Sequence, residues 1–235
     1  MFPYLPLLNK LPNFNLNLTK QMADLETLIE TNSKQEIFDL LSQNPALAGK
    51  DTSHGISPVL LACYYKKPDI AALIAGFGPK INLFEASALG RLEEATLLIN
   101  QNPDAVNTFS KDGFTALGLA AYFGNEEMAK LLISRNAEVN LPANNGFNVF
   151  PIHSAVSARN YNITKMLIEA GANVNVAQQA GFTPLHAAAQ QGDIELIILL
   201  LENGAEVAIA MEGGKVPADL AREKGFVEIA EILKV

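Results

Sequence analysis

Short apolar stripes with helical spacing recur along this chain, each one following a glycine. They are Ala95, Leu97 and Leu98 after Gly90; Met128, Ala129, Leu131 and Leu132 after Gly124; and Leu196, Ile197, Leu199 and Leu200 after Gly192. Residues three and four apart share one face of an α-helix, so each stripe predicts an amphipathic helix with one buried face. The chain is therefore expected to be a series of short helices.

A recurring dipeptide predicts that these helices repeat at a nearly constant interval. A β-branched residue followed by asparagine occurs as Ile81-Asn82, Val106-Asn107, Val139-Asn140 and Val174-Asn175, and the register extends back to Leu47-Ala48 and forward to Val207-Ala208. The steps between the second residues are 34, 25, 33, 35 and 33. A fixed period of roughly 20 to 50 residues is typical of solenoid proteins.

Turn glycines run in the same phase and lead to a recognisable motif. Gly113, Gly146, Gly181 and Gly214 are spaced by 33, 35 and 33 residues, and Gly181 is followed by Phe182-Thr183-Pro184-Leu185-His186-Ala187-Ala188-Ala189. This segment resembles the ankyrin repeat, whose signature is Thr-Pro-Leu-His-x-Ala in a unit of a β-turn and two helices. The resemblance makes physical sense, because Pro184 is tolerated at a helix start and Thr183 can cap the helix.

The resemblance implies an all-α fold, an ankyrin-repeat solenoid of stacked helix-turn-helix units with short β-hairpin fingers. We count about seven repeats in an ankyrin-repeat domain over residues 22–235, with approximate bounds 22–48, 49–82, 83–107, 108–140, 141–175, 176–208 and 209–235. Residues 1–21 are expected to be an N-terminal extension, either poorly ordered or a docking strand. Met22 is an alternative start.

Three departures from the repeat pattern predict local structure. The 25-residue step indicates one unit without its hairpin, so that Leu83 leads directly into a helix over residues 84–89. The 35-residue step places two extra residues before Pro151, which predicts a longer or bulged hairpin. Lys66 stands where the glycine between two helices is expected.

Charge and composition narrow the class of partner. A net charge of −8 and a pI of about 4.9 disfavour binding to phosphate backbones and anionic lipids, so we expect neither a nucleic acid nor a membrane as partner. Cys63 is the single cysteine, which fits a reducing compartment. No apolar run approaches the roughly 18 to 20 residues that span a bilayer. A soluble, cytoplasmic and monomeric protein is expected.

The titratable residues favour structural roles over catalysis. His153 and His186 occupy the fourth position of the Thr-Pro-Leu-His element, where the resemblance implies a hydrogen-bonded structural imidazole. Cys63 aligns with Ala189, a small position between helices, and His54 is expected in an exposed turn. Because the sequence has no phosphate-binding loop, paired-histidine metal helix or cysteine pair with zinc spacing, we expect no catalytic residues, no metal and no cofactor.

The resemblance also indicates where a partner would bind. In an ankyrin unit, the hairpin residues and the end of the first helix face the concave groove and have no packing duty. In this register the candidate partner-binding residues are Tyr64, Tyr65, Phe114, Tyr122, Phe123, Phe147, Phe182, Gln190 and Gln191. Aromatic residues are enriched at binding hot spots, but the phenylalanine after each hairpin glycine can instead pack one hairpin on the next.

These features favour a non-catalytic protein–protein interaction module or scaffold that binds a partner protein through its groove and hairpin tips. An inhibitory or stabilising subunit of one specific enzyme is the alternative. A metal-dependent enzyme built on the solenoid is a minor alternative. Because fold alone does not fix function, the identity of the partner is left open by the sequence.

Overall fold

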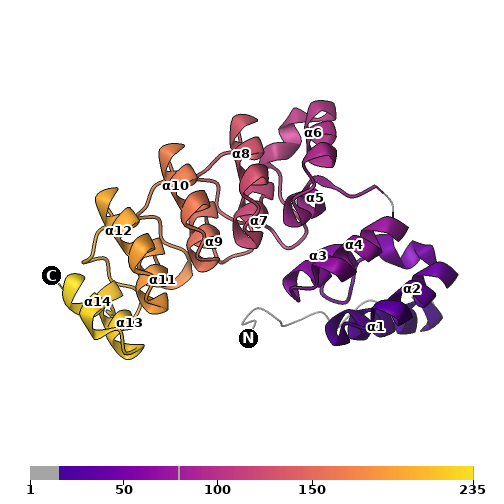
Figure 1. Ribbon diagram of the computed structural model, residues 1–235, viewed down its shortest axis with the longest axis horizontal. Helices are drawn as coiled ribbons and strands as arrows, with labels where there is room; N and C mark the ends of the chain where they lie inside the picture. The colour runs from indigo at the N-terminus through magenta and orange to yellow at the C-terminus, as the bar shows by residue number, and fades with distance from the viewer. Residues whose placement is uncertain (1–15, 79, 235) are drawn as a thin grey trace. The chain divides into compact units, whose positions relative to one another are not determined.

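The computed structural model describes residues 16–78 and 80–234, and this part of the chain is predominantly helical (Figure 1). It contains fourteen α-helices, α1–α14, and three short 3₁₀-helices, η1–η3. The predicted all-α class is therefore confirmed. Internal contacts divide the chain into unit 1, Met1–Glu85, and unit 2, Ala86–Val235.

Unit 1 holds two pairs of helices joined by a short 3₁₀-helix. Its elements are α1 (Leu16–Thr31), α2 (Lys34–Gln43), η1 (Pro45–Gly49), α3 (Pro58–Tyr64) and α4 (Pro68–Phe77). Helix α1 begins at Leu16, inside the segment 1–21 that the sequence assigns to an extension, and residues 1–15 lie outside the described residues.

Unit 2 contains the remaining helix pairs, and α5 crosses the boundary between the units. The elements are α5 (Leu83–Leu89), α6 (Leu92–Gln101), η2 (Pro103–Asn107), α7 (Ala116–Phe123), α8 (Glu126–Ser134), α9 (Pro151–Ser157), α10 (Tyr161–Glu169), η3 (Gln179–Gly181), α11 (Pro184–Gln191), α12 (Ile194–Glu202), α13 (Pro217–Glu223) and α14 (Val227–Ile232).

Helix α5 confirms the expected helix over residues 84–89 and shows how a unit without a hairpin begins. The backbone N–H of Asn82 donates to Oε2 of Glu85 at 2.9 Å, and the backbone N–H of Glu85 donates to Oδ1 of Asn82 at 2.9 Å. Two backbone donors at the helix start are thus satisfied reciprocally by two side chains.

The first helices of successive pairs approach closely because each carries an alanine at the same register position. The equivalent alanines Ala86, Ala120, Ala155, Ala188 and Ala221 are all 0% exposed. Helix α7 contacts α9, α9 contacts α11, and α11 contacts α13. A larger side chain at any of these positions would force the neighbouring backbones apart.

The turn within each pair uses a left-handed residue. Gly124 and Gly192 have φ values of 74° and 68°, as expected for a glycine that ends a helix. Lys66 and Arg159 occupy the equivalent positions with φ values of 58° and 55°. These two turns therefore keep the geometry of the glycine turns at the cost of strain in a residue with a side chain.

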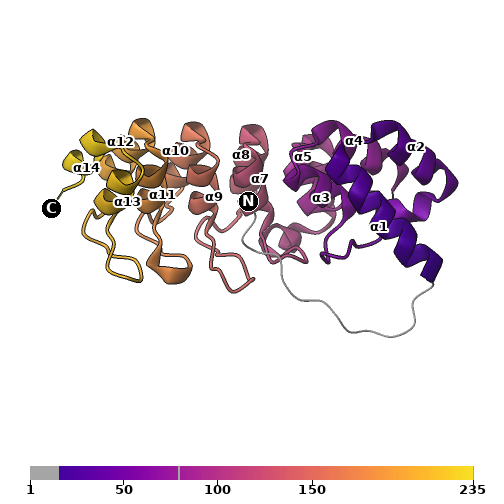
Figure 2. The ribbon, with the colours of Figure 1, turned by 90° about the horizontal axis from the view of Figure 1, so that it is seen from below.

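The fingers of unit 2 are hydrogen-bonded turns that project from one edge of the helices (Figure 2). In the described residues, β-type pairing in them is limited to one isolated bridge, Phe109–Thr115. The second finger of unit 2 closes with a bond from Ala143 N to Val149 O at 2.9 Å, and its span confirms the longer hairpin expected before Pro151. Adjacent fingers are joined by single backbone bonds, which are Asn144 N to Gly113 O at 2.7 Å, Gln179 N to Phe147 O at 2.8 Å and Glu212 N to Ala180 O at 2.8 Å.

The asparagines of the recurring dipeptide connect each repeat of unit 2 to the next. Asn140 donates through Nδ2 to the carbonyl of Gly171 at 2.9 Å and accepts through Oδ1 from the N–H of Asn173 at 2.9 Å. Asn107 and Asn175 each make the same pair of bonds, one to the residue 29 positions further along the chain and one to the residue 31 positions further along. We call this arrangement the asparagine clamp. It explains why asparagine recurs with the period of the repeat.

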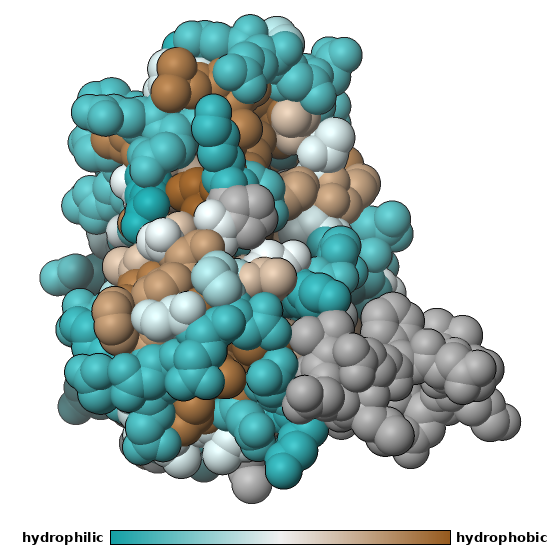
Figure 3. Space-filling model, turned by 90° about the vertical axis from the view of Figure 1, so that its right-hand side faces the viewer, coloured by the Kyte–Doolittle hydropathy of each residue, from teal (hydrophilic) through white to brown (hydrophobic). Residues whose placement is uncertain are grey.

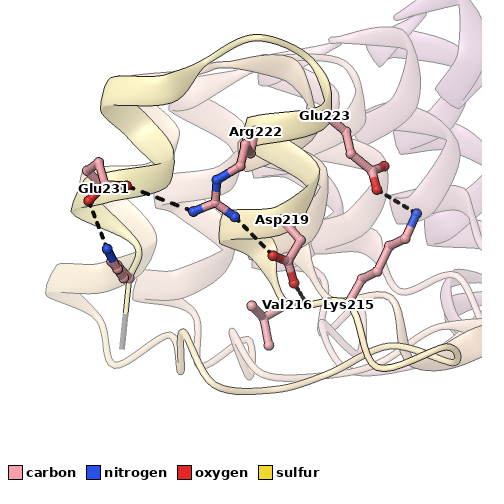
Figure 4. A network of polar contacts seen from close by, with 7 residues as sticks. Lys215, Val216, Asp219, Arg222, Glu223 and Glu231 are labelled. Atoms are coloured by element: carbon pink, nitrogen blue, oxygen red, sulfur yellow. Dashed lines mark hydrogen bonds and ion pairs between the residues drawn. The ribbon is translucent and has the colours of Figure 1, made fainter.

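The last helix pair carries charged side chains that pair with one another (Figure 4). Lys215 Nζ lies 2.7 Å from Glu223 Oε1, and Arg222 lies 3.2 Å from Asp219 and 3.9 Å from Glu231. All these groups are about half exposed, so each pair contributes little stability. Their consequence is a polar surface on this helix pair.

The left-handed turn at Lys66 generates a stability prediction. Replacing Lys66 with glycine should raise the free energy of unfolding by about 1 kcal/mol, because glycine adopts positive φ without the penalty of a Cβ atom. Lys50→Gly is the matched control, since Lys50 has an ordinary extended φ of −99° and glycine there should lower stability. Urea denaturation measures the free energy of unfolding of both variants, and equal effects of the two substitutions would contradict the prediction.

The asparagine clamp generates a second stability prediction. Asn140→Asp keeps the acceptor but removes the Nδ2 donor and places a carboxylate oxygen against the carbonyl of Gly171, so we expect a loss of about 1 kcal/mol at this exposed position. Asn144→Asp, on an exposed finger residue, should change stability much less. Thermal or urea unfolding checks the difference, and equal losses would show that the clamp adds no stability.

Candidate partner-binding site

The predicted residues of unit 2 lie at two kinds of position. Tyr122 and Phe123 end helix α7, and Gln190 and Gln191 end α11, whereas the three phenylalanines lie in the fingers, each directly after a turn glycine. We call these seven residues the recognition set: Phe114, Tyr122, Phe123, Phe147, Phe182, Gln190 and Gln191. Tyr64 and Tyr65 belong to unit 1, and their placement in one groove with the recognition set stays a prediction.

Tyr122 and Phe123 form an aromatic pair at the end of α7. Their ring centroids are 5.1 Å apart at an interplanar angle of 84°, an edge-to-face arrangement. Tyr122 is 38% exposed, and Phe123 is half-buried. Burial raises the pKa of the Tyr122 phenol above its usual value, so the hydroxyl is neutral at physiological pH. The pair presents a fixed apolar surface with a polar tip.

The finger phenylalanines are half-buried and have a packing role as well as exposed area. The Phe182 ring lies 5.6 Å from the His186 ring, and the Phe182 carbonyl accepts a hydrogen bond from His153 Nε2 at 3.0 Å. Phe147 offers its carbonyl to the next finger. Both of the roles considered from the sequence, contact with a partner and packing of hairpins, are compatible with this partial burial.

The glutamines at the end of α11 differ in exposure. Gln190 is exposed, whereas Gln191 is half-buried and its backbone carbonyl accepts a bond from Arg159 at 3.0 Å. The side-chain Oε1 of Gln191 is shielded from solvent, and within the described part of the chain no group donates to it. An acceptor of this kind is costly until a donor reaches it.

In unit 1, Tyr64 ends helix α3 and Tyr65 follows it, and both are half-buried. Burial, with smaller effects from Glu30 and Glu26, raises the pKa of Tyr65. The sequence correctly places this pair at a helix end. The turn beyond it is the left-handed Lys66.

The two histidines that share a register position, His153 and His186, are buried parts of the scaffold rather than reactive groups. His153 is 2% exposed and His186 is 0% exposed. Nδ1 of each imidazole accepts a hydrogen bond from a backbone N–H at the start of its own helix. The donor is Phe150 N for His153, at 3.3 Å, and Thr183 N for His186, at 3.2 Å. Nε2 of each imidazole faces a backbone carbonyl of the following finger. Each imidazole therefore joins a helix to the next repeat.

Cys63 is a buried thiol, and His54 lies in a turn beside a carboxylate of α1. Burial, assisted by Glu85, raises the pKa of the Cys63 thiol to about 12, so the thiol stays protonated and weakly nucleophilic. His54 is half-buried instead of exposed as expected, because its Nδ1 lies 3.8 Å from Glu26, which also accepts from Ser53 N at 2.6 Å. Glu26 on α1 thus holds this turn in place.

Comparison with known families identifies the class of protein. A family model described as "Ankyrin repeats (3 copies)" matches residues 59–143, 83–178 and 152–234. These matches extend over most of the chain and agree with the helix pairs, fingers and structural histidines described above. The chain belongs to the ankyrin-repeat family, whose members are generally protein-interaction modules and generally non-catalytic.

Individual relatives are much longer proteins. The chain is 31% identical over 108 residues to ankyrin repeat and SAM domain-containing protein 6 of Rattus norvegicus, which covers 46% of this chain and 12% of that protein. It is 29% identical over 120 residues to alpha-latroinsectotoxin-Lt1a of Latrodectus tredecimguttatus, covering 47% of this chain and 8% of the toxin. In the described residues, no helix has the length and apolarity needed to cross a membrane.

The buried imidazole of His153 generates a pH prediction. Burial lowers its pKa from 6.5 to about 4, so between these values the unfolded chain binds a proton that the folded chain does not. Stability is therefore fully present above pH 6.5 and falls with pH toward 4, by about 2 kcal/mol between pH 7 and pH 5. Urea denaturation at pH 7 and at pH 5 measures this loss in free energy of unfolding, and the His153→Gln variant should lack it. An identical pH dependence in both proteins would contradict the assignment.

Proposed function

We propose that this chain is a non-catalytic protein–protein interaction module that binds a partner protein through the recognition set and the finger tips. The observation that carries the proposal is the Tyr122–Phe123 pair, which packs edge to face at a helix end and leaves 38% of Tyr122 exposed. Rigid aromatic side chains with a polar handle are the residues on which binding energy concentrates.

Two further features support the proposal. The fingers that carry Phe114, Phe147 and Phe182 are linked in series by backbone bonds, so their spacing is fixed before a partner arrives. A preorganised surface loses less conformational entropy on binding. The amides of Gln190 and Gln191 add neutral polar groups beside the aromatic residues. We further propose that the protein works in the cytoplasm as a monomer.

The proposal predicts that a Tyr122→Ala, Phe123→Ala variant loses its partner. Affinity capture from a lysate of the native host identifies proteins bound by the wild type, and calorimetry with the purified partner then measures affinity. We expect the double variant to bind about 30-fold more weakly, the effect of losing roughly 2 kcal/mol at a hot spot.

Leu97→Ala provides the matched control. Leu97 is 61% exposed on α6 and lies outside the recognition set, so its removal should leave affinity unchanged. Circular dichroism shows whether each variant retains the wild-type helix content. If the folded double variant binds the captured partner as tightly as the wild type does, the recognition set is not the binding site.

A further inference from the structure

The second helices of unit 2 carry exposed apolar side chains that the proposed function does not use. Apolar residues come to the surface among hydrophilic ones elsewhere on the molecule too (Figure 3), but here three of them share a register position and a fourth lies one turn further along its helix. Tyr161, Ile194 and Val227 are the first residues of α10, α12 and α14 and are 39%, 38% and 58% exposed. Ile198, one turn into α12, is 49% exposed. We call these four residues the outer stripe.

Contacts between successive repeats place the starts of these three helices side by side. Arg159, two residues before Tyr161, donates to the carbonyl of Gln191 at 3.0 Å. The ring of Phe226, the residue before α14, covers Gly192, where an added Cβ would come within 2.6 Å of the ring. Helices α10 and α12 also contact each other and lie next to each other in Figures 1 and 2. The outer stripe therefore runs over the starts of second helices in three successive repeats.

The core does not explain the apolar character of the outer stripe. Helix α12 already buries Leu196, Ile197, Leu199 and Leu200. In the repeat that contains α8, the residues equivalent to Ile194 and Ile198 are the charged residues Glu126 and Lys130. A helix of this fold thus functions with a charged outer face, and contiguous exposed apolar residues on a neighbouring helix indicate an interaction surface.

Carboxylates border the outer stripe. Glu195 and Glu202 on α12 and Glu228 on α14 are exposed, and in the described part of the chain no cation pairs with them. By contrast, Glu169 and Glu231 each pair with a lysine. The stripe therefore combines apolar side chains with negative charge that has no partner within the unit. Its charge complement is a cationic, amphipathic segment.

The spacing of the stripe selects the conformation of that segment. Packed helices lie about 8 to 10 Å apart, and seven residues of an α-helix rise about 10.5 Å, so one apolar residue per heptad can reach each of the three helices. In a β-strand, same-face residues recur about every 6.6 Å and do not match. We infer that the outer stripe binds an amphipathic α-helix with basic flanks, supplied by a partner protein and lying across α10, α12 and α14.

A designed peptide tests this inference on the full chain. The probe is a fluorescent 18-residue peptide with leucines at positions 1, 4, 8, 11 and 15, lysines beside them and alanine or glutamine elsewhere. Fluorescence anisotropy should show saturable binding to the wild type, at least tenfold weaker binding to Ile194→Ser, Ile198→Ser, and unchanged binding to the control Leu97→Ser. Glu195→Gln, Glu202→Gln, Glu228→Gln should weaken binding and reduce its dependence on salt.

Three results would overturn the inference. One is equal binding of a peptide with the same composition and scattered leucines, and another is tighter binding of a proline-rich peptide with leucine at every third residue. The third is a wild-type dimer, seen by light scattering, that Ile194→Ser, Ile198→Ser converts to monomers, because a second copy would then cover the stripe. Tyr122→Ala, Phe123→Ala should bind the probe normally, so this test is independent of the proposed function.

Discussion

Close contact between successive first helices is the constraint on which unit 2 depends. Each of these helices places one fully buried alanine against its neighbour, and the backbone N–H that begins the following helix donates to the carbonyl of that same alanine, as Asn125 does to Ala120. One small side chain thus sets both the distance between repeats and the geometry of the turn within a repeat. The fingers and second helices take their positions from this contact.

Two further sets of bonds follow the same interval along the stack. The structural histidines tie α9 and α11 to the next finger, and the asparagine clamps tie the ends of second helices together. Each bond is modest, but all of them join groups about one repeat apart in sequence. In such a chain, stability is set by contacts between neighbouring repeats, and a defect in one repeat is felt mainly by the two beside it.

The sequence was sufficient to predict the helices because the helical stripes and the turn glycines have the same period. It was sufficient to predict α5 without a hairpin, since the step of 25 residues leaves no room for a finger. The start of α1 at Leu16 could not be read in the same way, because no repeat motif precedes Met22 and local polarity does not mark a boundary. Likewise, Lys66 lacks the glycine that signals a left-handed turn, and only the packing around it imposes that conformation.

The candidate site was less predictable than the fold for a physical reason. A phenylalanine beside a finger glycine satisfies the same sequence pattern whether it packs a hairpin or contacts a partner, and Phe182 is half-buried against His186 while part of it reaches solvent. The outer stripe was not proposed from the sequence, although the helical register already leaves Ile194 and Ile198 out of the apolar stripe of α12 that packs in the core. Register assigns a residue to a face of a helix, but only the packed structure shows how much of its side chain stays exposed.

The second finger of unit 2 shows how this architecture tolerates changes in length. Between Asn140 and Asn175 the step is 35 residues, yet the clamps at both asparagines have bonds as short as those at Asn107. The additional residues are taken up by the finger between Ala143 and Val149, outside the stacked helices. Insertions and deletions at finger tips can therefore diversify the surface offered to partners while the spacing of the stack is inherited unchanged, so that recognition and folding evolve as separate traits.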